Sequence, residues 1–326
     1  MNIVLLHDQL SSESAADEKD VIVQMDAVGA ALAELGHEST RMACTLDLSA
    51  AAQKLKAAKP DIVFNLVESL GGDGRLIHLA PALLESARIP FTGCASDAVF
   101  STSNKLIAKR LLSGAYLTTP TWYSAPDLGR SEPFEPGRYI LKSVWEHASR
   151  GLDEDSIVEA RDPRSLLKLL KEREPRLAGE GFAEFYVDGR EFNLSMLAGR
   201  VLPAAEIVFE NYAANKPKVV GYKAKWDESS FEYTHTPRRF DFPDSDLPLI
   251  RQLSSIAHEC WRIFGLRGYA RVDFRVDEAG TPWILEVNSN PCLSLDAGFA
   301  AAVARSGMTY AHAIRRILDD TIKPSH

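Results

Sequence analysis

Cysteine, excess positive charge and long apolar runs are all scarce in this 326-residue chain. Its four cysteines form no C-x-x-C pair, so neither a zinc knuckle nor a disulfide framework is indicated and a reducing compartment is expected. The formal net charge is −8, which leaves no basic surplus for binding nucleic acid or an anionic membrane surface. No apolar run reaches the roughly 18 residues of a membrane span, and the first residues lack the basic region of a signal peptide. We therefore expect a soluble cytoplasmic protein with small-molecule partners.

Signatures of several enzyme classes are also missing. The chain has no G-x-S-x-G nucleophile motif and no cysteine paired with a histidine. Gly71-Gly-Asp-Gly74 lacks the G-x-G-x-x-G spacing of a dinucleotide site and is more typical of a tight turn ahead of a helix over 75–86. The four cysteines are Cys44, Cys94, Cys260 and Cys292. Without a paired base, Cys292 is expected to be a small buried residue rather than a nucleophile.

The first 95 residues alternate between strand and helix patterns. Strands are expected over 2–6 and 61–67, and helices over 21–35 and 48–58. This alternation predicts a parallel, doubly wound α/β sheet. Ligands of such sheets bind at the carboxyl ends of the strands, which places 65–74 beside a crevice.

The rest of the chain loses this strict alternation and is expected to be α+β. A chain of this length is expected to divide into two or three domains. A long polar stretch over 210–236 separates two groups of elements. Helices are expected over 103–113, 162–173, 247–263 and 306–320, and strands over 138–142, 182–187, 191–197, 201–209, 269–276 and 282–288.

The last predicted strand carries an unusual pair of polar side chains. In Trp283-Ile-Leu-Glu-Val-Asn288 the period of two places Glu286 and Asn288 on one face. Trp283, Leu285 and Val287 are expected on the opposite face. A proline follows closely, at Pro291, and stops the strand.

The preceding strand, over 269–276, is expected to form a hairpin with it. A turn at Asp277-Glu-Ala-Gly280 sets Asp273 opposite Glu286 and Arg271 opposite Asn288. Facing carboxylates repel unless a cation lies between them. Carboxylate and amide oxygens are hard ligands that suit magnesium held together with phosphates. The alternative is the solvated face of an edge hairpin, but the proline break and the lysines elsewhere favour a metal site.

Three lysines are candidates for binding a polyphosphate. Lys142 ends a strand before a loop over 146–151 whose Ala, Ser and Gly residues allow backbone N–H groups to approach an anion. Lys105 opens a helix behind Ser and Thr caps, and Lys225 lies in the polar stretch. Each lysine alone is more typical of a solvated surface.

Together these segments resemble the ATP-grasp ligases, in the D-alanine–D-alanine ligase branch. The resemblance spans nearly the whole chain, in the family's order. The matching segments are 64–93 with "GGDG" and "IPFTG", "SNK", "ILK", the loop over 146–152, "GREFNLSML", "KAKW" and "GYARVDFRV…WILEVNSNPCLS". It implies a three-domain ATP-grasp architecture: an N-terminal α/β substrate domain (1–96) and two α+β subdomains that sandwich ATP, one over 97–187 and one over 188–326.

The resemblance also implies roles for individual residues. Lys105 and Lys142 would hold the α- and β-phosphates, Lys225 the γ-phosphate, and Asp273, Glu286 and Asn288 two Mg²⁺ ions, with Mn²⁺ as an alternative. Ser149 and Gly151 would belong to the loop that covers the phosphates. Glu184, Phe185 and Val187 would line the adenine slot, and Glu191 would bind the ribose hydroxyls. Arg271 and the backbone N–H of Cys292 would stabilise the oxyanion.

The amino-acid pocket departs from the family pattern. The family's substrate-facing histidine falls at Val67 or Glu68, and a serine and a tyrosine that hold the first D-alanine fall at Ala148 and Trp226. Candidates to bind that residue's ammonium are Glu13 and Asp17. The family's glycine is Cys292, and its Ser-Leu grip on the second D-alanine falls near Ala297 and Gly298, beside Asp296.

The leading prediction is therefore an ADP-forming carboxylate–amine ligase with altered substrates. It would activate a carboxylate as an acyl-phosphate, which an amine then attacks. The alternatives are a genuine D-alanine–D-alanine ligase of peptidoglycan precursor synthesis and a non-catalytic ATP-binding regulatory module. The resemblance implies a possible homodimer, which is common in that family, while the sequence alone does not fix the oligomeric state.

Overall fold

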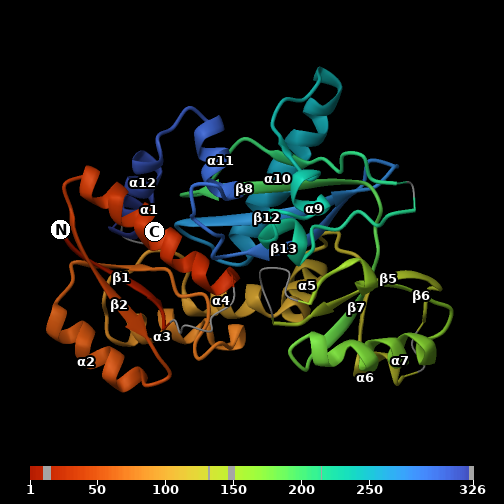
Figure 1. Cartoon of the computed structure of the whole chain (residues 1–326), viewed down its shortest axis with the longest axis horizontal. Helices are drawn as coiled ribbons and strands as arrows, with labels where there is room; N and C mark the ends of the chain where they lie inside the picture. The colour runs from red at the N-terminus through yellow and green to blue at the C-terminus, as the bar shows by residue number, and fades with distance from the viewer. Residues whose placement is uncertain (10–15, 131–132, 146–150, 214, 323–326) are drawn as a thin grey trace.

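The computed structural model describes residues 1–9, 16–130, 133–145, 151–213 and 215–322, without the side chains of 16–19 and 322. Its strands form three sheets, drawn from 2–65, 122–185 and 190–288 in turn. Figure 1 shows the N-terminal sheet, in red and orange, at one end of the molecule and the strands β5 to β7, in yellow and green, at the other. The predicted mixed α/β and α+β architecture is confirmed, while the domain boundaries at 96/97 and 187/188 stay a prediction.

The N-terminal sheet has the order β2-β1-β3 and all its pairings are parallel, as predicted. Its central strand is β1, and residues 3–6 of that strand are almost completely buried. The polar edge strand β2 has no alternation that marks it as a strand, so it was not predicted from the sequence. The elements of this region are β1 (Asn2–Asp8), α1 (Ala16–Glu34), β2 (Glu38–Cys44), α2 (Leu48–Ala58), β3 (Ile62–Asn65), the 3-10 helix η1 (Gly74–Leu76) and α3 (Leu79–Ser86).

The second sheet is antiparallel, in the order β4-β7-β5-β6. Helix α7 covers this sheet. Its first turn is fixed by a reciprocal capping box between Asp162 and Ser165, with Pro163 at the first helical position. The elements are α4 (Ser96–Ser103), α5 (Lys105–Gly114), β4 (Trp122–Ser124), α6 (Ala125–Leu128), β5 (Gly137–Ser143), η2 (Glu154–Ser156), β6 (Ile157–Ala160), α7 (Pro163–Arg173), η3 (Glu174–Arg176) and β7 (Gly181–Phe185).

The third sheet runs β11-β10-β8-β12-β13, with β9 paired to β8. Its apolar face packs on α10 and α5, because Leu253, Ala257 and Cys260 of α10 meet Val272 and Phe274 of β12. The elements are β8 (Arg190–Leu197), β9 (Arg200–Val201), β10 (Ala205–Ile207), α8 (Tyr222–Trp226), α9 (Phe231–Thr234), β11 (Arg238–Arg239), η4 (Asp244–Asp246), α10 (Leu247–Ile263), β12 (Tyr269–Val276), β13 (Pro282–Asn288), α11 (Gly298–Arg305) and α12 (Tyr310–Ile322).

Two predicted helices begin later than expected, each after a local stop. The helix expected over 103–113 is α5, which begins at Lys105 because Asn104 leaves the helical conformation and its side chain accepts the N–H of Ile107 to cap the helix. The helix before it, α4, was not predicted. The helix expected over 306–320 begins later, at α12, since Gly307 has a positive φ of 78° and ends the turn after α11.

Helix α12 returns the end of the chain to the N-terminal region. Ile314 and Ile317 pack in one apolar cluster with Val28 and Leu32 of α1, and Figure 1 shows both termini on this side. Among the described helices, none combines the length and apolar character that a bilayer crossing needs.

Candidate functional site

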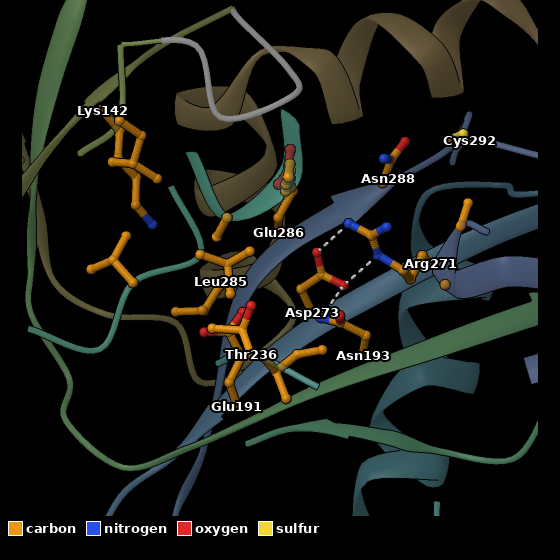
Figure 2. Close-up of a pocket in the computed structure, with 18 of the residues that line it drawn as sticks. Lys142, Glu191, Asn193, Thr236, Arg271, Asp273, Leu285, Glu286, Asn288 and Cys292 are labelled. Atoms are coloured by element: carbon orange, nitrogen blue, oxygen red, sulfur yellow. Dashed lines mark hydrogen bonds and ion pairs between the residues drawn. The ribbon is translucent and has the colours of Figure 1, made fainter. Parts of the chain in front are cut away.

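A cavity of about 580 Å³ lies where residues of the second and third sheets and of the 222–238 segment meet. Predicted phosphate, metal and substrate residues all contribute to its lining. Figure 2 shows Lys142 on one side and the polar face of β12 and β13 on the other. The fold therefore gathers residues that are more than 180 positions apart in the sequence, from Lys105 to Asn288.

The polar hairpin has the predicted pairing. Asp273 is opposite Glu286 and Arg271 is opposite Asn288. Arg271 holds Asp273 with two parallel hydrogen bonds, from Nε to Oδ1 at 2.7 Å and from Nη2 to Oδ2 at 2.8 Å, and Asn193 Nδ2 donates to Oδ1 at 2.9 Å. Figure 2 shows Arg271 and Asn193 converging on Asp273, with Glu286 on the neighbouring strand.

A β-bulge interrupts the hairpin beside this face. Asp273 pairs with Glu286, but Phe274 pairs with Ile284, so Leu285 is an extra residue. Leu285 lines the cavity together with Glu286, and the prediction that it lies on the opposite face was wrong. Strict alternation fails there because the extra residue reverses the order of faces.

The oxygen donors of the hairpin suit a magnesium ion shared with phosphate oxygens. They are two carboxylates and one amide, all hard ligands. Within the described part of the chain no three His, Cys, Asp or Glu side chains form a metal cluster, so an ion here needs the Asn288 amide and ligand oxygens. Burial lowers the pKa of Arg271, but the charge and hydrogen bonds of the Asp273 carboxylate outweigh burial. The net effect raises the pKa of Arg271 above its ordinary value, so Arg271 is a cation.

The three predicted phosphate lysines all line the cavity. Lys105 Nζ lies 3.7 Å from Glu286 Oε1, and Lys142 forms an ion pair with Glu184. Lys225 comes from the short helix α8. Burial, followed by the charge of Arg271, lowers the pKa of Lys225. Three lysines around one cavity supply the positive charge that a polyphosphate requires.

The predicted nucleoside residues come from β7, β8 and the segment between them. Glu184, Phe185 and Val187 line the cavity, although the Glu184 carboxylate is turned to Lys142 and Lys109. Glu191 is also in the lining, and its Oε2 accepts a hydrogen bond from Arg275 Nη2 at 2.7 Å. Burial raises the pKa of Glu191 despite this arginine.

Gly151 is not part of the cavity lining, and Ser149 lies outside the described residues. Gly151 has a φ of 68°, and a Cβ there would lie 2.1 Å from the carbonyl oxygen of Arg176. Only glycine fits this close approach. The next residue, Leu152, lines the cavity and accepts a hydrogen bond from the N–H of Tyr222 at 3.0 Å, which ties the end of the loop to α8.

Three of the five predicted substrate residues line the cavity: Glu68, Trp226 and Asp296. Glu13 lies outside the described residues. Asp17 lies in α1, and its side chain is outside the described part as well.

Asp20 and Arg238 are among the cavity residues that were not predicted from the sequence. Asp20 accepts hydrogen bonds from the thiol of Cys292 at 2.9 Å and the hydroxyl of Ser294 at 2.8 Å. Arg238 Nη1 donates to the carbonyl oxygen of Asp296 at 2.9 Å. Asp20 carried no signal because it stands in an acidic stretch, whereas the tandem arginines at 238–239 in a polar segment were a weak one.

The thiol of Cys292 is held in its protonated form. Burial, together with the nearby charges of Asp20 and Glu68, raises its pKa well above the ordinary value. A thiol of this kind is a poor nucleophile, since the thiolate is the reactive species.

Residues 170–319 match the family model described as the D-ala D-ala ligase C-terminus. A protein of Sinorhizobium fredii, described as the uncharacterized protein y4sG, is 29% identical over 90% of this chain and 86% of its own length. A D-alanine–D-alanine ligase of Aquifex aeolicus is also 29% identical, over 98% of this chain and 100% of its own.

The fold has a close match among solved structures. The D-alanine–D-alanine ligase of Bacillus anthracis superposes with a TM-score of 0.73 at 21% identity, covering 99% of this chain and 97% of that one. Its complex with ATP gives a TM-score of 0.71 at 20% identity, with the same coverage. At such identities the likeness concerns the fold.

Proposed function

Because the chain belongs to the D-alanine–D-alanine ligase-like branch of the ATP-grasp superfamily, we propose that it is an ATP-dependent ligase that joins a carboxylate to an amine. ADP and phosphate are the other products. The observation that carries this proposal is the placement of Lys105, Lys142 and Lys225 around the same cavity as the Asp273–Glu286 face. Nucleotide binding alone does not need the hairpin's complete set of charged groups.

The residues of the chain divide the work by charge. Lys105, Lys142 and Lys225 bind and orient the phosphates, and Asp273, Glu286 and Asn288 would hold magnesium. A bound Mg²⁺ would neutralise charge on the phosphate oxygens. Arg271, with the backbone N–H of Cys292, faces the reacting carboxyl, where fixed donors stabilise developing negative charge.

The reaction that suits this site has two steps. The substrate carboxylate attacks the γ-phosphorus and releases ADP, giving an acyl-phosphate. The amine then attacks the acyl carbon, phosphate leaves, and the amine loses a proton. Both steps place negative charge on oxygen, and neither requires a nucleophile from the protein.

We propose that the amino-acid pocket accepts substrates other than two D-alanines. Glu68, Asp20 and Asp296 bring three carboxylates to the cavity lining, and Arg238, which donates to the carbonyl oxygen of Asp296, brings a cation. These charges favour a substrate with an additional ionic group over a simple aliphatic amino acid.

A screen for ADP release across pairs of acids and amines tests the proposal. Turnover with a charged pair, and little with D-alanine alone, is the expected result. Robust dipeptide formation from D-alanine would identify a D-alanine–D-alanine ligase instead. No turnover with any pair, despite tight binding of ATP with magnesium, would refute the ligase.

The Cys292→Ala variant is expected to keep kcat within about threefold of the wild type, because the backbone N–H remains and the thiol is protonated. Steady-state kinetics with the substrate pair found in the screen checks this. A loss of a hundredfold or more, roughly the effect of removing a catalytic group, would show that the side chain takes part in the chemistry.

A further inference from the structure

Lys109 is a buried cation that forms no part of the cavity lining. Its side chain is 3% exposed, and its ammonium group donates to Thr119 Oγ1 at 2.7 Å and to the carbonyl oxygen of Pro120 at 3.0 Å. The third contact is an ion pair with Glu184 Oε2 at 2.6 Å. All three ammonium protons therefore have an oxygen nearby.

Glu184 joins this buried lysine to one that faces the cavity. Its carboxylate is almost fully buried, with Oε2 toward Lys109 and Oε1 paired to Lys142. The register places Glu184 on β7 opposite Ile140 of β5, two residues before Lys142, so the two side chains are neighbours on one face. A single buried carboxylate thus has two cationic partners, one fixed and one beside the cavity.

The fixed partner is anchored to the hairpin strand β13. The hydroxyl of Thr119, which accepts from Lys109, donates to the carbonyl oxygen of Ile284 at 2.8 Å, and the N–H of Ile284 donates to the carbonyl oxygen of Thr118 at 2.9 Å. Ile284 lies two residues before Glu286. Lys109 therefore connects the strand that carries Glu286 to the carboxylate that holds Lys142.

We propose that Lys109 is a positioning residue that keeps the Glu184 carboxylate charge-balanced when Lys142 turns to a nucleotide phosphate. A buried carboxylate with a single counter-ion resists losing it, because an unpaired buried charge is costly. With Lys109 in place, Lys142 is free to leave. Without Lys109, Glu184 retains Lys142, and nucleotide affinity falls. This inference rests on the proposed nucleotide site at Lys142.

Isothermal titration with a non-hydrolysable ATP analogue and Mg²⁺ tests the role without the ligase substrates. Lys109→Met should raise Kd about tenfold or more, while Lys109→Arg, which keeps the charge, should stay within about threefold. Lys168→Met is the matched control, since Lys168 is an exposed lysine of α7 with a 77% exposed side chain. An unchanged Kd in a folded Lys109→Met protein overturns the inference.

A second comparison separates charge balance from packing. In the Glu184→Gln variant, Lys142 has no ion pair with residue 184 to break before it binds a phosphate. Adding Lys109→Met to this variant should therefore change the nucleotide Kd by less than about twofold. A further tenfold rise there would mean that Lys109 acts through packing, which also overturns the inference. This double variant lacks both buried charges and carries the test if Lys109→Met alone does not fold.

The pH dependence of nucleotide binding gives an independent readout. Burial lowers the pKa of Lys109 to about 8. The negative charge of Glu184 on β7 raises this pKa, and the positive charge of Lys142 on β5 lowers it, but burial has the largest effect. The positive charge of Lys109 is therefore present below about pH 8 and lost above it. The wild-type Kd should rise between pH 7.5 and 9, whereas the Kd of Lys109→Arg should not, because arginine stays protonated. The same rise in both proteins overturns the inference.

The outcomes also separate this inference from the proposed function. Failure of the wild-type protein to bind the nucleotide would refute the proposed ATP site itself. Nucleotide binding that is insensitive to Lys109→Met would leave that site standing and remove only the role of Lys109.

Discussion

Glu286→Gln is expected to lower kcat by at least about 10³-fold, roughly 4 kcal/mol of transition-state stabilisation, while the protein stays folded. The substitution keeps the size of the side chain and removes the carboxylate charge that, with Asp273, would hold magnesium. Glu286 is on a solvent-accessible face, with a 26% exposed side chain, so its loss of charge changes stability little. ADP release gives kcat, and thermal unfolding gives stability.

Glu278→Gln is the matched control for this variant. Glu278 lies in the turn of the same hairpin and is exposed, so the same chemical change occurs there outside the cavity. Its kcat should equal that of the wild type. Full turnover by Glu286→Gln would refute the assignment of Glu286 as a metal ligand.

The hairpin shows why part of the site was predictable. Its turn composition and its period of two are local features, and they fix which residue of one strand faces which residue of the other. The pairing of Asp273 with Glu286 follows from them, and the structure confirms it. The bulge that turns Leu285 into the cavity depends on how the two strands pair, and no residue type within the strand marks its position.

Contacts between distant segments account for what the sequence could not provide. Asp20 and Cys292 are 272 residues apart and meet because α1 packs against the loop that follows β13. Lys109 has the sequence pattern of a surface lysine on α5, one turn after Lys105. It becomes buried because the 118–120 segment, which is hydrogen-bonded to Ile284 of β13, also accepts hydrogen bonds from the ammonium group of Lys109. Tertiary packing, rather than local propensity, sets both environments.

The helix boundaries show the same limit at a local scale. The helix predicted over 103–113 corresponds to α5, which begins two residues later at Lys105, and the periodicity did not reveal α4 before it. The break between α4 and α5 depends on Asn104, whose side chain competes with the backbone for the N–H of Ile107. Asparagine is compatible with either outcome, so composition did not decide between them.

Arg271→Met is expected to lower kcat by about 10²- to 10³-fold, the range found when a donor to a developing oxyanion is removed. Arg271 lies opposite Asn288 and has an 18% exposed side chain in the cavity lining, where its charge is little screened by solvent. Because it acts on charge that appears in the transition state, kcat and kcat/KM should fall together, with the nucleotide Kd changed by less than about fivefold. Steady-state kinetics and calorimetry measure the two quantities.

Two further variants make this result specific. Arg262→Met removes an arginine of α10 whose side chain is 72% exposed, and it should leave kcat unchanged. Arg271→Lys keeps the charge but loses the paired hydrogen bonds to Asp273, so its kcat should lie between those of Arg271→Met and the wild type. If Arg271→Met instead raises the nucleotide Kd and leaves kcat unchanged, the guanidinium binds the ground state, and the oxyanion role belongs to other donors in the cavity.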